Sequence, residues 1–342
     1  MPRLIPSLAE LDGYDRLPDG FHQLLTPPEP EPPFHDVGEL ERTWGCRWGA
    51  DDEVSRLRKV LVRQPGDELA AVRADAYRPG FDAFVDEGGA WHWTGSEPPD
   101  LARLHAQHAG LVAALRGEGV EVVVAEPLAP RFTKAMYVRD PLVTVRGGAI
   151  VGRLAPRMRR GEEAALTREA AALGMPILGT VVGSGTLEGG SFAKLRPGLA
   201  VLGTSVRCND AGAEQLRELL RRIGWELLVV PLPGFVVHLD IHFAMVDRDR
   251  ALVNANGLPY TFMEELARRG VECIWAHPDE PWALNLLTLA PGRVLTSESA
   301  PRTAELLRAR GVEVIAIPYD EAHKNGGGVH CSTQELLRDA AE

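Results

Sequence analysis

One phrase recurs five times along the chain and limits its possible folds more than any other feature. An amphipathic helical run ends at a glycine, and a short apolar segment follows. These segments lie at intervals of roughly 40 to 55 residues and read GVEVVV from Gly119, GMPILG from Gly174, GWELLV from Gly224, GVECIW from Gly270 and GVEVIA from Gly311. A glycine directly after a helix can adopt positive φ and stop that helix. The phrase therefore predicts a repeated unit of helix and strand.

Two β-rich runs joined by turn residues precede each of the last four helical runs. These predicted hairpins cover residues 141–154, 192–205, 243–255 and 284–297, and their turns are RGG, RPG, DRD and APG. The first unit is less regular, because RKVLVRQ is its evident strand and a long insertion precedes its helix.

A single ββαβ unit cannot bury both a helix face and a sheet face, so the units must stack on one another. A closed ring of five would direct strand ends toward a central axis. The predicted fold is an α/β protein, specifically a five-bladed α/β propeller of ββαβ repeats around a central active-site channel. The alternative is an ordinary doubly wound α/β sheet, which hairpins ahead of every helix do not favour.

The segment before the repeats is rich in proline. Its clustered prolines are Pro18, Pro27, Pro28, Pro30, Pro32 and Pro33. Proline disfavours helix interiors and central strands, so we expect an extended arm wrapped on the domain. The predicted division is a proline-rich arm over residues 1–50 and a single catalytic propeller domain over residues 51–342.

Charge and hydropathy narrow the classes of partner. The chain has 48 acidic and 37 Lys and Arg residues, a formal net charge of −11, which repels nucleic acid and anionic lipid. Apolar runs such as 227–232 are far shorter than the roughly 20 residues of a membrane helix, and the first residues lack a signal-peptide pattern. Four cysteines without a CxxC pair do not suggest a disulfide framework. We expect a cytoplasmic protein with a small-molecule partner, no nucleic acid and no membrane; homo-oligomerisation stays open.

Polar residues recur at one phase of the repeat. They are Asp140 in YVRDP, Glu188 in LEGGSF, His238 and Asp240 in VHLDIHF, Asn285 in WALNLL and Cys331 in GGGVHCSTQ. The first four sites precede or open the first strand of a unit, whereas Cys331 follows the closing strand of the last unit and a glycine-rich turn. In a ring, these side chains would face the axis together.

Three carboxylates around one point favour a bound cation, because buried carboxylates are costly without one. A metal is one candidate, since His238, Asp240 and His242 would alternate on one face of a strand. No second Asp/His cluster accompanies them, which favours an organic cation. Near Cys331, the glycines at 326–328 let the backbone approach a ligand closely, and this is the setting of a nucleophile.

At these residues the sequence resembles the guanidino-group-modifying superfamily, the pentein fold, which contains arginine deiminases, dimethylarginine dimethylaminohydrolases, agmatine deiminases and amidinotransferases. The motifs RDP, EGG, HxD and GGGxHC carry the resemblance, which extends from about Asp52 to the C-terminus. It implies a nucleophile at Cys331 and a general acid/base at His238. It also implies guanidinium-binding carboxylates, at Asp140, Glu188 and Asp240.

The same resemblance implies residues that bind the rest of the substrate. Arg207 matches an arginine that holds the substrate carboxylate, and Arg159 or Arg160 matches a second one. The further candidates for substrate binding are Arg139, Lys134, Tyr137 and His330. Two positions depart from the family pattern: Ser191 replaces an acid, and Lys134 stands where deiminases tend to have an asparagine.

The sequence thus predicts a C–N hydrolase that acts on arginine or an arginine-like guanidino compound through a covalent thiouronium on Cys331, without a metal and without a cofactor. The first alternative is an amidinotransferase, which passes the amidino group to an amine. Two further alternatives are a metal-dependent ureohydrolase-like enzyme and a catalytically inactive binding propeller. The last is disfavoured because the chain retains a nucleophile, a base and three acids.

Overall fold

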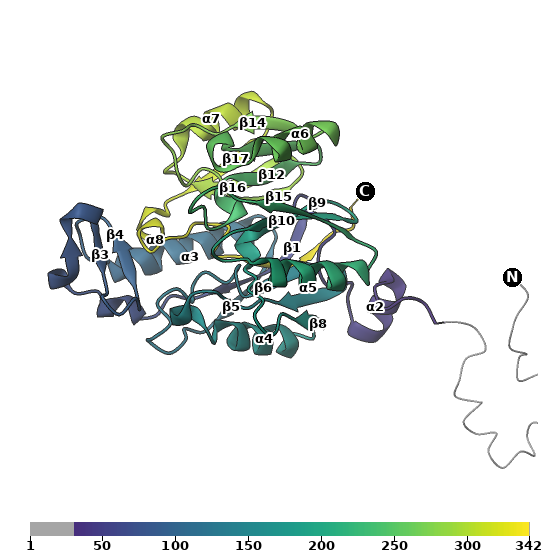
Figure 1. Cartoon of the computed structure of the whole chain (residues 1–342), viewed down its shortest axis with the longest axis horizontal. Helices are drawn as coiled ribbons and strands as arrows, with labels where there is room; N and C mark the ends of the chain where they lie inside the picture. The colour runs from purple at the N-terminus through teal and green to yellow at the C-terminus, as the bar shows by residue number, and fades with distance from the viewer. Residues whose placement is uncertain (1–30, 342) are drawn as a thin grey trace, which may run out of the picture.

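The computed structural model describes residues 31–341, and over this range strands and helices alternate in repeated units (Figure 1). Each unit has the order strand, strand, helix, strand. The second strand pairs antiparallel with the strand before it and parallel with the strand after the helix. The predicted α/β class and its ββαβ repeat are therefore confirmed.

Four units follow one another along the chain. The second unit contains β6 (Leu142–Val145), β7 (Gly148–Val151), α4 (Glu162–Ala172) and β8 (Ile177–Thr180). The third contains β9 (Phe192–Arg196), β10 (Leu199–Thr204), α5 (Asp210–Arg221) and β11 (Glu226–Pro231). The fourth contains β12 (Phe243–Asp247), β13 (Arg250–Val253), α6 (Tyr260–Arg268) and β14 (Glu272–Trp275). The fifth contains β15 (Leu287–Ala290), β16 (Arg293–Ser297), α7 (Pro301–Ala309) and β17 (Glu313–Ile317). All four predicted hairpins are confirmed.

The glycines that led to the repeat have the conformation expected of them. Gly119, Gly174, Gly224, Gly270 and Gly311 all have φ between 76° and 90°. This left-handed region disfavours residues with a Cβ, so glycine is what lets each helix stop and the next strand begin within a few residues.

The first unit is built from two distant parts of the chain. β1 (Leu57–Arg63), α3 (Leu101–Gly117) and β5 (Glu121–Ala125) follow in order, but the strand antiparallel to β1 is β18 (Gln334–Arg338). The sequence pattern did not predict β18. Its segment QELLR does not alternate between apolar and polar residues. Two charged side chains, Glu335 and Arg338, occupy fully buried positions where a strand usually has apolar residues.

Two further segments lie outside the repeats. The insertion between β1 and α3 forms a small antiparallel sheet of β2 (Tyr77–Arg78), β3 (Ala83–Val85) and β4 (His92–Thr94), which projects at the left of Figure 1. A short helix, α8 (Asp320–Lys324), follows β17.

The N-terminal segment differs from the predicted extended arm. Most of its clustered prolines fall in residues 1–30, outside the described residues, but α2 (Val37–Trp44) is helical. Its start is capped by the Asp36 carboxylate, which accepts a hydrogen bond from the Glu39 N–H at 3.1 Å, and Gly45 ends it at φ 77°. A helix is possible here because this stretch contains no proline. The division of the chain at residue 50 stays a prediction.

Apolar side chains join each sheet to the next. The described part of the chain contains five clusters of buried residues, and each cluster connects two units. Four clusters connect units that are consecutive in the sequence, and the remaining cluster connects the fifth unit with the first. In that order, representative pairs are Leu61 with Val151, Val145 with Leu202, Val201 with Phe243, Leu252 with Val294 and Leu295 with Val60. Each unit therefore buries its apolar surface against two neighbours. Across residues 31–341, no helix combines the length and the apolar character needed to cross a membrane.

A group of charged side chains is buried where β18 meets the third unit. Glu335 contacts Lys194 of β9 and Arg338 of β18, and Arg139 Nη1 lies 3.7 Å from Glu335 Oε1. Lys194 Nζ also lies 2.7 Å from Glu53 Oε1. Burial acts to raise the pKa of Glu335, but the charges of Lys194, Arg338 and Arg139 lower it below its usual range. Glu335 is therefore ionised and compensates a surplus of positive charge.

Replacement of Glu335 by alanine is expected to destabilise the fold strongly. Loss of one partner leaves buried cations uncompensated, and this typically costs about 3–5 kcal/mol in the free energy of unfolding. The matched control is Glu121→Ala in β5 of the same sheet. Its side chain is 65% exposed and pairs with Lys59, so its loss should cost less than about 1 kcal/mol. Urea denaturation measures both values, and similar losses for the two variants would contradict the role given to Glu335.

Candidate active site

The polar residues selected from the repeat all lie just before the first strand of a unit. Asp140 precedes β6, and Asn285 precedes β15. Glu188 and His238 each precede a single 3₁₀ turn, η7 (Gly189–Ser191) and η8 (Leu239–Ile241), which leads into β9 and β12. Cys331 precedes β18, so it occupies the same phase as the others and not the separate position that its sequence context suggested. The sheets thus deliver these five side chains from equivalent positions.

The predicted alternation of His238, Asp240 and His242 on one strand is wrong. The backbone N–H of His242 donates to the Leu239 carbonyl at 2.9 Å, which closes the η8 turn, and β12 begins only at Phe243. His238 and Asp240 are buried in the site, whereas His242 Nδ1 is buried without a hydrogen-bond partner among the described residues. His242 is therefore not placed beside the other two as a third ligand.

His238 lies between two carboxylates. Its Nε2 is 2.7 Å from Glu188 Oε2, and its Nδ1 is 3.7 Å from Asp140 Oδ1. Burial acts to lower the pKa of His238, but Asp140, Glu188 and Asp240 raise it to about 9. The ring is therefore an imidazolium near neutral pH and can act as a proton donor.

The two carboxylates are themselves fixed by hydrogen bonds. Asp140 accepts from the Gly190 N–H at 3.1 Å and forms an ion pair with Arg159. Burial acts to raise the pKa of Asp140, but the charges of His238 and Arg159 bring it below its usual range. Arg159 also donates to Glu162 and to the Tyr137 carbonyl.

Glu188 is fully buried and joins several groups. It accepts from the Ala155 N–H at 2.8 Å and pairs with Arg207 Nη1 at 2.9 Å, besides its bond to His238. Burial acts to raise the pKa of Glu188, and its hydrogen bond to His238 is the main influence that lowers it overall. Arg207 therefore pairs with Glu188, and not with Asp210 or Glu214 on the neighbouring helix.

Cys331 is surrounded by hydrogen-bonding groups that fix its sulfur. The Asn285 amide Nδ2 donates to Sγ at 3.0 Å, and its Oδ1 accepts from the Cys331 backbone N–H at 3.1 Å. Asp240 Oδ2 lies 3.6 Å from Sγ. Burial first, and then the negative charges of Asp240 and Asp140, raise the pKa of the Cys331 thiol well above its usual value. The sulfur is therefore a thiol in the empty site, and a bound cation would favour its thiolate form.

Asp240 has one free acceptor. Its Oδ2 accepts from His330 Nδ1 at 2.8 Å and from Asn285 Nδ2 at 3.3 Å. Its Oδ1 is buried and has no hydrogen-bond partner in the part of the chain that the structure describes. A buried carboxylate oxygen without a partner is costly, so this atom is suited to accept a hydrogen bond from a ligand.

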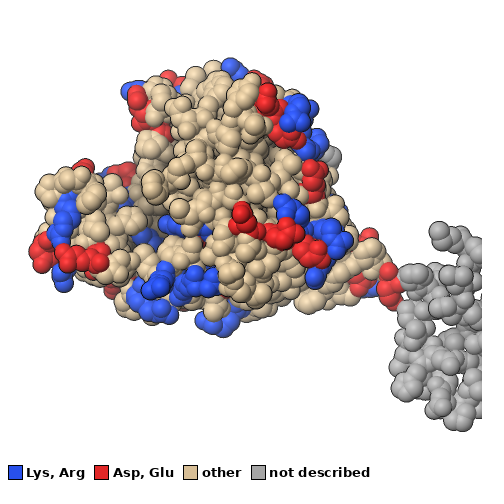
Figure 2. Space-filling model, viewed as in Figure 1, with Lys and Arg blue, Asp and Glu red and all other residues tan. Residues whose placement is uncertain are grey.

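A cavity of about 140 Å³ opens beside these residues. Cys331, His238 and Asp140 line it, while Glu188 and Asp240 are not part of its wall. The remaining lining residues are His92, Lys134, Tyr137, Pro156, Met158, Arg159, Arg207, Val237, Asn325 and Gly326. In Figure 2, Lys and Arg atoms are visible between the insertion at the left and the rest of the molecule.

The predicted substrate-binding residues divide into two groups. Lys134, Tyr137, Arg159 and Arg207 line this cavity. Arg160 does not, since its Nε donates to the Leu154 carbonyl at 2.8 Å. Arg139 does not either, because its guanidinium is buried toward Glu335. Their positions therefore give no support to a contact between Arg139 or Arg160 and a ligand.

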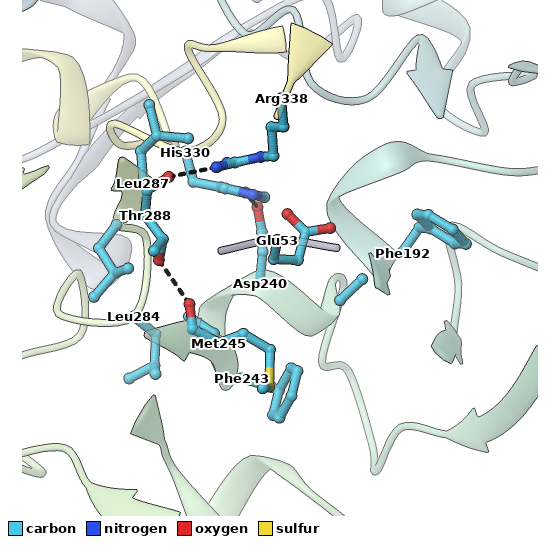
Figure 3. A pocket seen from close by; sticks show the side chains of 13 residues that line it. Glu53, Phe192, Asp240, Phe243, Met245, Leu284, Leu287, Thr288, His330 and Arg338 are labelled. Carbon is cyan, nitrogen blue, oxygen red and sulfur yellow. Dashed lines mark hydrogen bonds and ion pairs between the residues drawn. The ribbon is translucent and has the colours of Figure 1, made fainter. Parts of the chain in front are cut away.

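His330 and Asp240 both line a second, smaller cavity (Figure 3). This space of about 20 Å³ is large enough for roughly one water molecule. Glu53 and Arg338 also line it, and Arg338 Nη2 is buried without a hydrogen-bond partner among the described residues. Asp240 thus contacts Cys331 through Oδ2 and also borders the smaller cavity that Glu53 and Arg338 line.

Several residues of the site were not predicted. Asn285 was noticed from its phase in the repeat but was given no role, although it holds the Cys331 sulfur. His92, Asn325 and Glu162 were missed. His92 belongs to the insertion, which has no counterpart in the other units, so the repeat contained no signal for it.

Asp140, Glu188 and His238 also present ligand atoms within 4.8 Å of one another, which is a possible metal arrangement. In this structure Asp140 pairs with Arg159, and Glu188 pairs with both His238 and Arg207. A metal would have to compete with these cations for the same carboxylates.

Comparisons with known proteins agree with this chemistry. A model of the arginine deiminase family matches residues 128–274 and 268–338. The dimethylarginine dimethylaminohydrolase of Streptomyces coelicolor is 29% identical over 279 residues, which cover 82% of this chain and 97% of that protein.

Solved structures share the fold. The dimethylarginine dimethylaminohydrolase of Pseudomonas aeruginosa, in complex with citrulline, has a TM-score of 0.67 at 24% identity and covers 82% of this chain and 99% of its own. An amidinotransferase of Microseira wollei has a TM-score of 0.69 at 19% identity and covers 86% of this chain and 98% of its own.

The charge of His238 is expected to make stability depend on pH. Because the pKa of His238 is raised from 6.5 to about 9, its protonation stabilises the folded state fully below pH 6.5, and this contribution is lost as the pH rises through about 9. The stability of the protein relative to a His238→Asn variant should therefore fall by about 3 kcal/mol between about pH 6 and about pH 9.5. Urea denaturation of both proteins across this range measures it. A difference that is constant or grows with pH would disagree with a charged His238.

Proposed function

The chain belongs to the arginine deiminase family, within the guanidino-group-modifying superfamily, and we propose that it hydrolyses a C–N bond of arginine or an arginine-like guanidino compound. One observation carries this proposal. The wall of a single cavity contains a cysteine thiol and a histidine whose pKa is raised to about 9 by neighbouring carboxylates. These are the nucleophile and the proton donor that such a cleavage requires.

The proposal includes a ring arrangement of the repeats, a five-bladed α/β propeller. Its support is the set of apolar clusters, which join each unit to the next and the fifth to the first. The pairing of β18 with β1 would close the ring. Each blade would then contribute one polar residue to the channel at the axis.

Carboxylates would hold the guanidinium flat beside the sulfur. Asp140 lies on the cavity wall, and Asp240, whose Oδ2 lies 3.6 Å from the Cys331 sulfur, has a second oxygen without a partner among the described residues. Charge-assisted hydrogen bonds from guanidinium to carboxylate are strong and directional. Glu188 would act mainly through His238, which it contacts at 2.7 Å. The positive charge of the guanidinium would favour loss of the Cys331 proton to solvent.

The thiolate then attacks the central carbon of the guanidinium and forms a neutral tetrahedral adduct. His238 donates its proton to the departing amino group, which leaves as ammonia, and the remaining carbon is a thiouronium cation bonded to sulfur. Neutral His238 next removes a proton from water. The resulting hydroxide attacks the thiouronium carbon to give a neutral adduct. Its carbon–sulfur bond then breaks, and the sulfur takes up the proton of the new hydroxyl group, which gives the ureido product and the free Cys331 thiol.

An amidinotransferase is the second candidate, and the fold shared with the Microseira wollei protein is the observation in its favour. In that reaction an amine, in place of water, attacks the same thiouronium. Incubation with arginine, with and without an amine acceptor, separates the two reactions. Citrulline without an acceptor indicates hydrolysis, and ornithine formed only with an acceptor indicates transfer. A mass-spectrometric screen of guanidino compounds extends the test to other substrates.

Replacement of Cys331 by alanine should abolish turnover and leave the fold intact. The change removes the nucleophile but deletes only one small atom from the site. The matched control is Cys273→Ala in β14, a half-buried cysteine that does not line the cavity, and it should retain activity. Steady-state rates and far-UV circular dichroism measure both outcomes. More than a few per cent of the activity in folded Cys331→Ala would rule out the covalent mechanism.

Metal chelators are expected to leave the rate unchanged. The proposed chemistry uses Cys331 and His238, and the carboxylates that could bind a metal are paired with Arg159, Arg207 and His238. Activity is measured before and after prolonged incubation with EDTA, followed by desalting. A loss that Zn²⁺ or Mn²⁺ restores would favour the metal-dependent alternative built on Asp140, Glu188 and His238.

A further inference from the structure

Lys134 is a buried lysine on the wall of the cavity, and no carboxylate of the described residues forms an ion pair with it. Its Nζ donates to Asn325 Oδ1 at 2.7 Å, to the His92 carbonyl at 3.2 Å and to the Asn325 carbonyl. These oxygens satisfy its N–H groups, but they carry no net charge. Among residues 31–341, no Asp or Glu oxygen lies within ion-pair distance of Lys134, which is unusual for a lysine that is 5% exposed.

The other cations of the cavity have partners. Arg159 pairs with Asp140 and Glu162, and Glu188 pairs with both Arg207 and His238. Over the described residues, this network therefore sets three carboxylates against three cations, and Lys134 stands outside it without a carboxylate partner.

The pKa of Lys134 reflects the absence of a carboxylate partner. Burial first, and then the charges of Arg159 and Arg207, lower the pKa of Lys134 well below its usual value. Like charges thus converge on the side of the cavity that Lys134 lines. A bound anion would raise the pKa of Lys134 and favour its charged form, whereas a bound ammonium would oppose that form.

The complementary charge lies beside the sulfur. Asp240 contacts Asn285, His330 and Cys331, and no Lys or Arg pairs with it in the described part of the chain. Its Oδ1 has no partner. Over the described residues, the site thus contains one carboxylate near the nucleophile that pairs with His330 but with no Lys or Arg, and one lysine on the cavity wall that pairs with no carboxylate.

An α-amino acid fits this arrangement poorly. Its ammonium group would add a positive charge to the region of Lys134, Arg159 and Arg207, and Asp140, the one carboxylate among the described residues that line the cavity, lies at the guanidinium end. The oxygens beside Lys134 already accept hydrogen bonds from Lys134 itself.

We propose that the substrate is an ω-guanidino carboxylate without an α-ammonium group, and that Lys134 determines this specificity. Its guanidinium would face Asp140 close to the Cys331 sulfur, and its carboxylate would lie near Lys134 and Arg207. This inference rests on the proposed function and names the substrate class of that site.

Three compounds with the same guanidino group and the same carbon chain test the inference. They are 5-guanidinopentanoate, arginine, which adds an α-ammonium, and agmatine, which has an amine in place of the carboxylate. The dissociation constants are measured by isothermal titration calorimetry with folded Cys331→Ala protein, which cannot turn them over. We expect 5-guanidinopentanoate to bind at least about tenfold more tightly than arginine, and agmatine to bind most weakly. Equal or tighter binding of arginine, or no measurable binding of 5-guanidinopentanoate, would overturn the inference.

A lysine variant tests the residue itself. Lys134→Met keeps the side-chain length and removes the charge, so it should weaken binding of 5-guanidinopentanoate by about ten- to a hundredfold and reduce its preference over arginine. Lys59→Met, which removes one charge far from the cavity, should leave both affinities unchanged. An unchanged preference in folded Lys134→Met would also overturn the inference.

Turnover by the unmodified protein separates this inference from the proposed function. If 5-guanidinopentanoate binds as expected but neither it nor arginine is converted and no adduct forms on Cys331, the proposed reaction fails while the ligand class stands. If arginine is converted and preferred, the reaction stands and the inference fails.

Discussion

Each three-stranded sheet leaves apolar surface that only its neighbours cover, and the position of every functional residue depends on this packing. Leu61 with Val151 and Leu295 with Val60 show that the first sheet is packed on both sides. Contacts of this kind contribute roughly 25 cal/mol per Å² of apolar area buried. Because each polar residue lies just before a first strand, the same packing that stabilises the sheets fixes where these residues meet.

The second constraint is that a buried charge needs a partner of opposite charge. Most contacts within the site satisfy this need. Asp140, Glu188 and Glu162 are buried, and each has a cationic partner in Arg159, Arg207 or His238. Removal of one partner would leave a charge without compensation, so these groups act as one network. The raised pKa of His238 is a consequence of this network, because two carboxylates contact the ring.

The sequence predicted those parts of the fold and site that follow the repeat. Glycines with positive φ, hairpin turns and one polar residue per unit are local patterns, and they led to Asp140, Glu188, His238 and Cys331. β18 was missed because its charged side chains are buried in an ion network, which reverses the usual relation between charge and exposure.

The remaining residues of the site could not be predicted because they depend on contacts between distant segments. His92 comes from an insertion without a counterpart, and Asn325, which contacts Lys134 at 2.7 Å, lies 191 residues away along the chain. The alternation expected for His238, Asp240 and His242 failed for a local reason, since a 3₁₀ turn replaces the strand there. A single turn of this kind has no strong sequence signal.

The high pKa of the Cys331 thiol connects binding with reactivity. The carboxylates that suit a guanidinium also oppose a thiolate, because both Asp240 and Asp140 raise the pKa of the sulfur. A cation bound between them would offset their negative charge and lower the pKa of the thiol. In this arrangement the thiolate would form mainly when a cation is bound, so the proposed guanidinium site would also limit reaction of the cysteine with other electrophiles. The substrate would then complete the charge balance of a site that is incomplete without it.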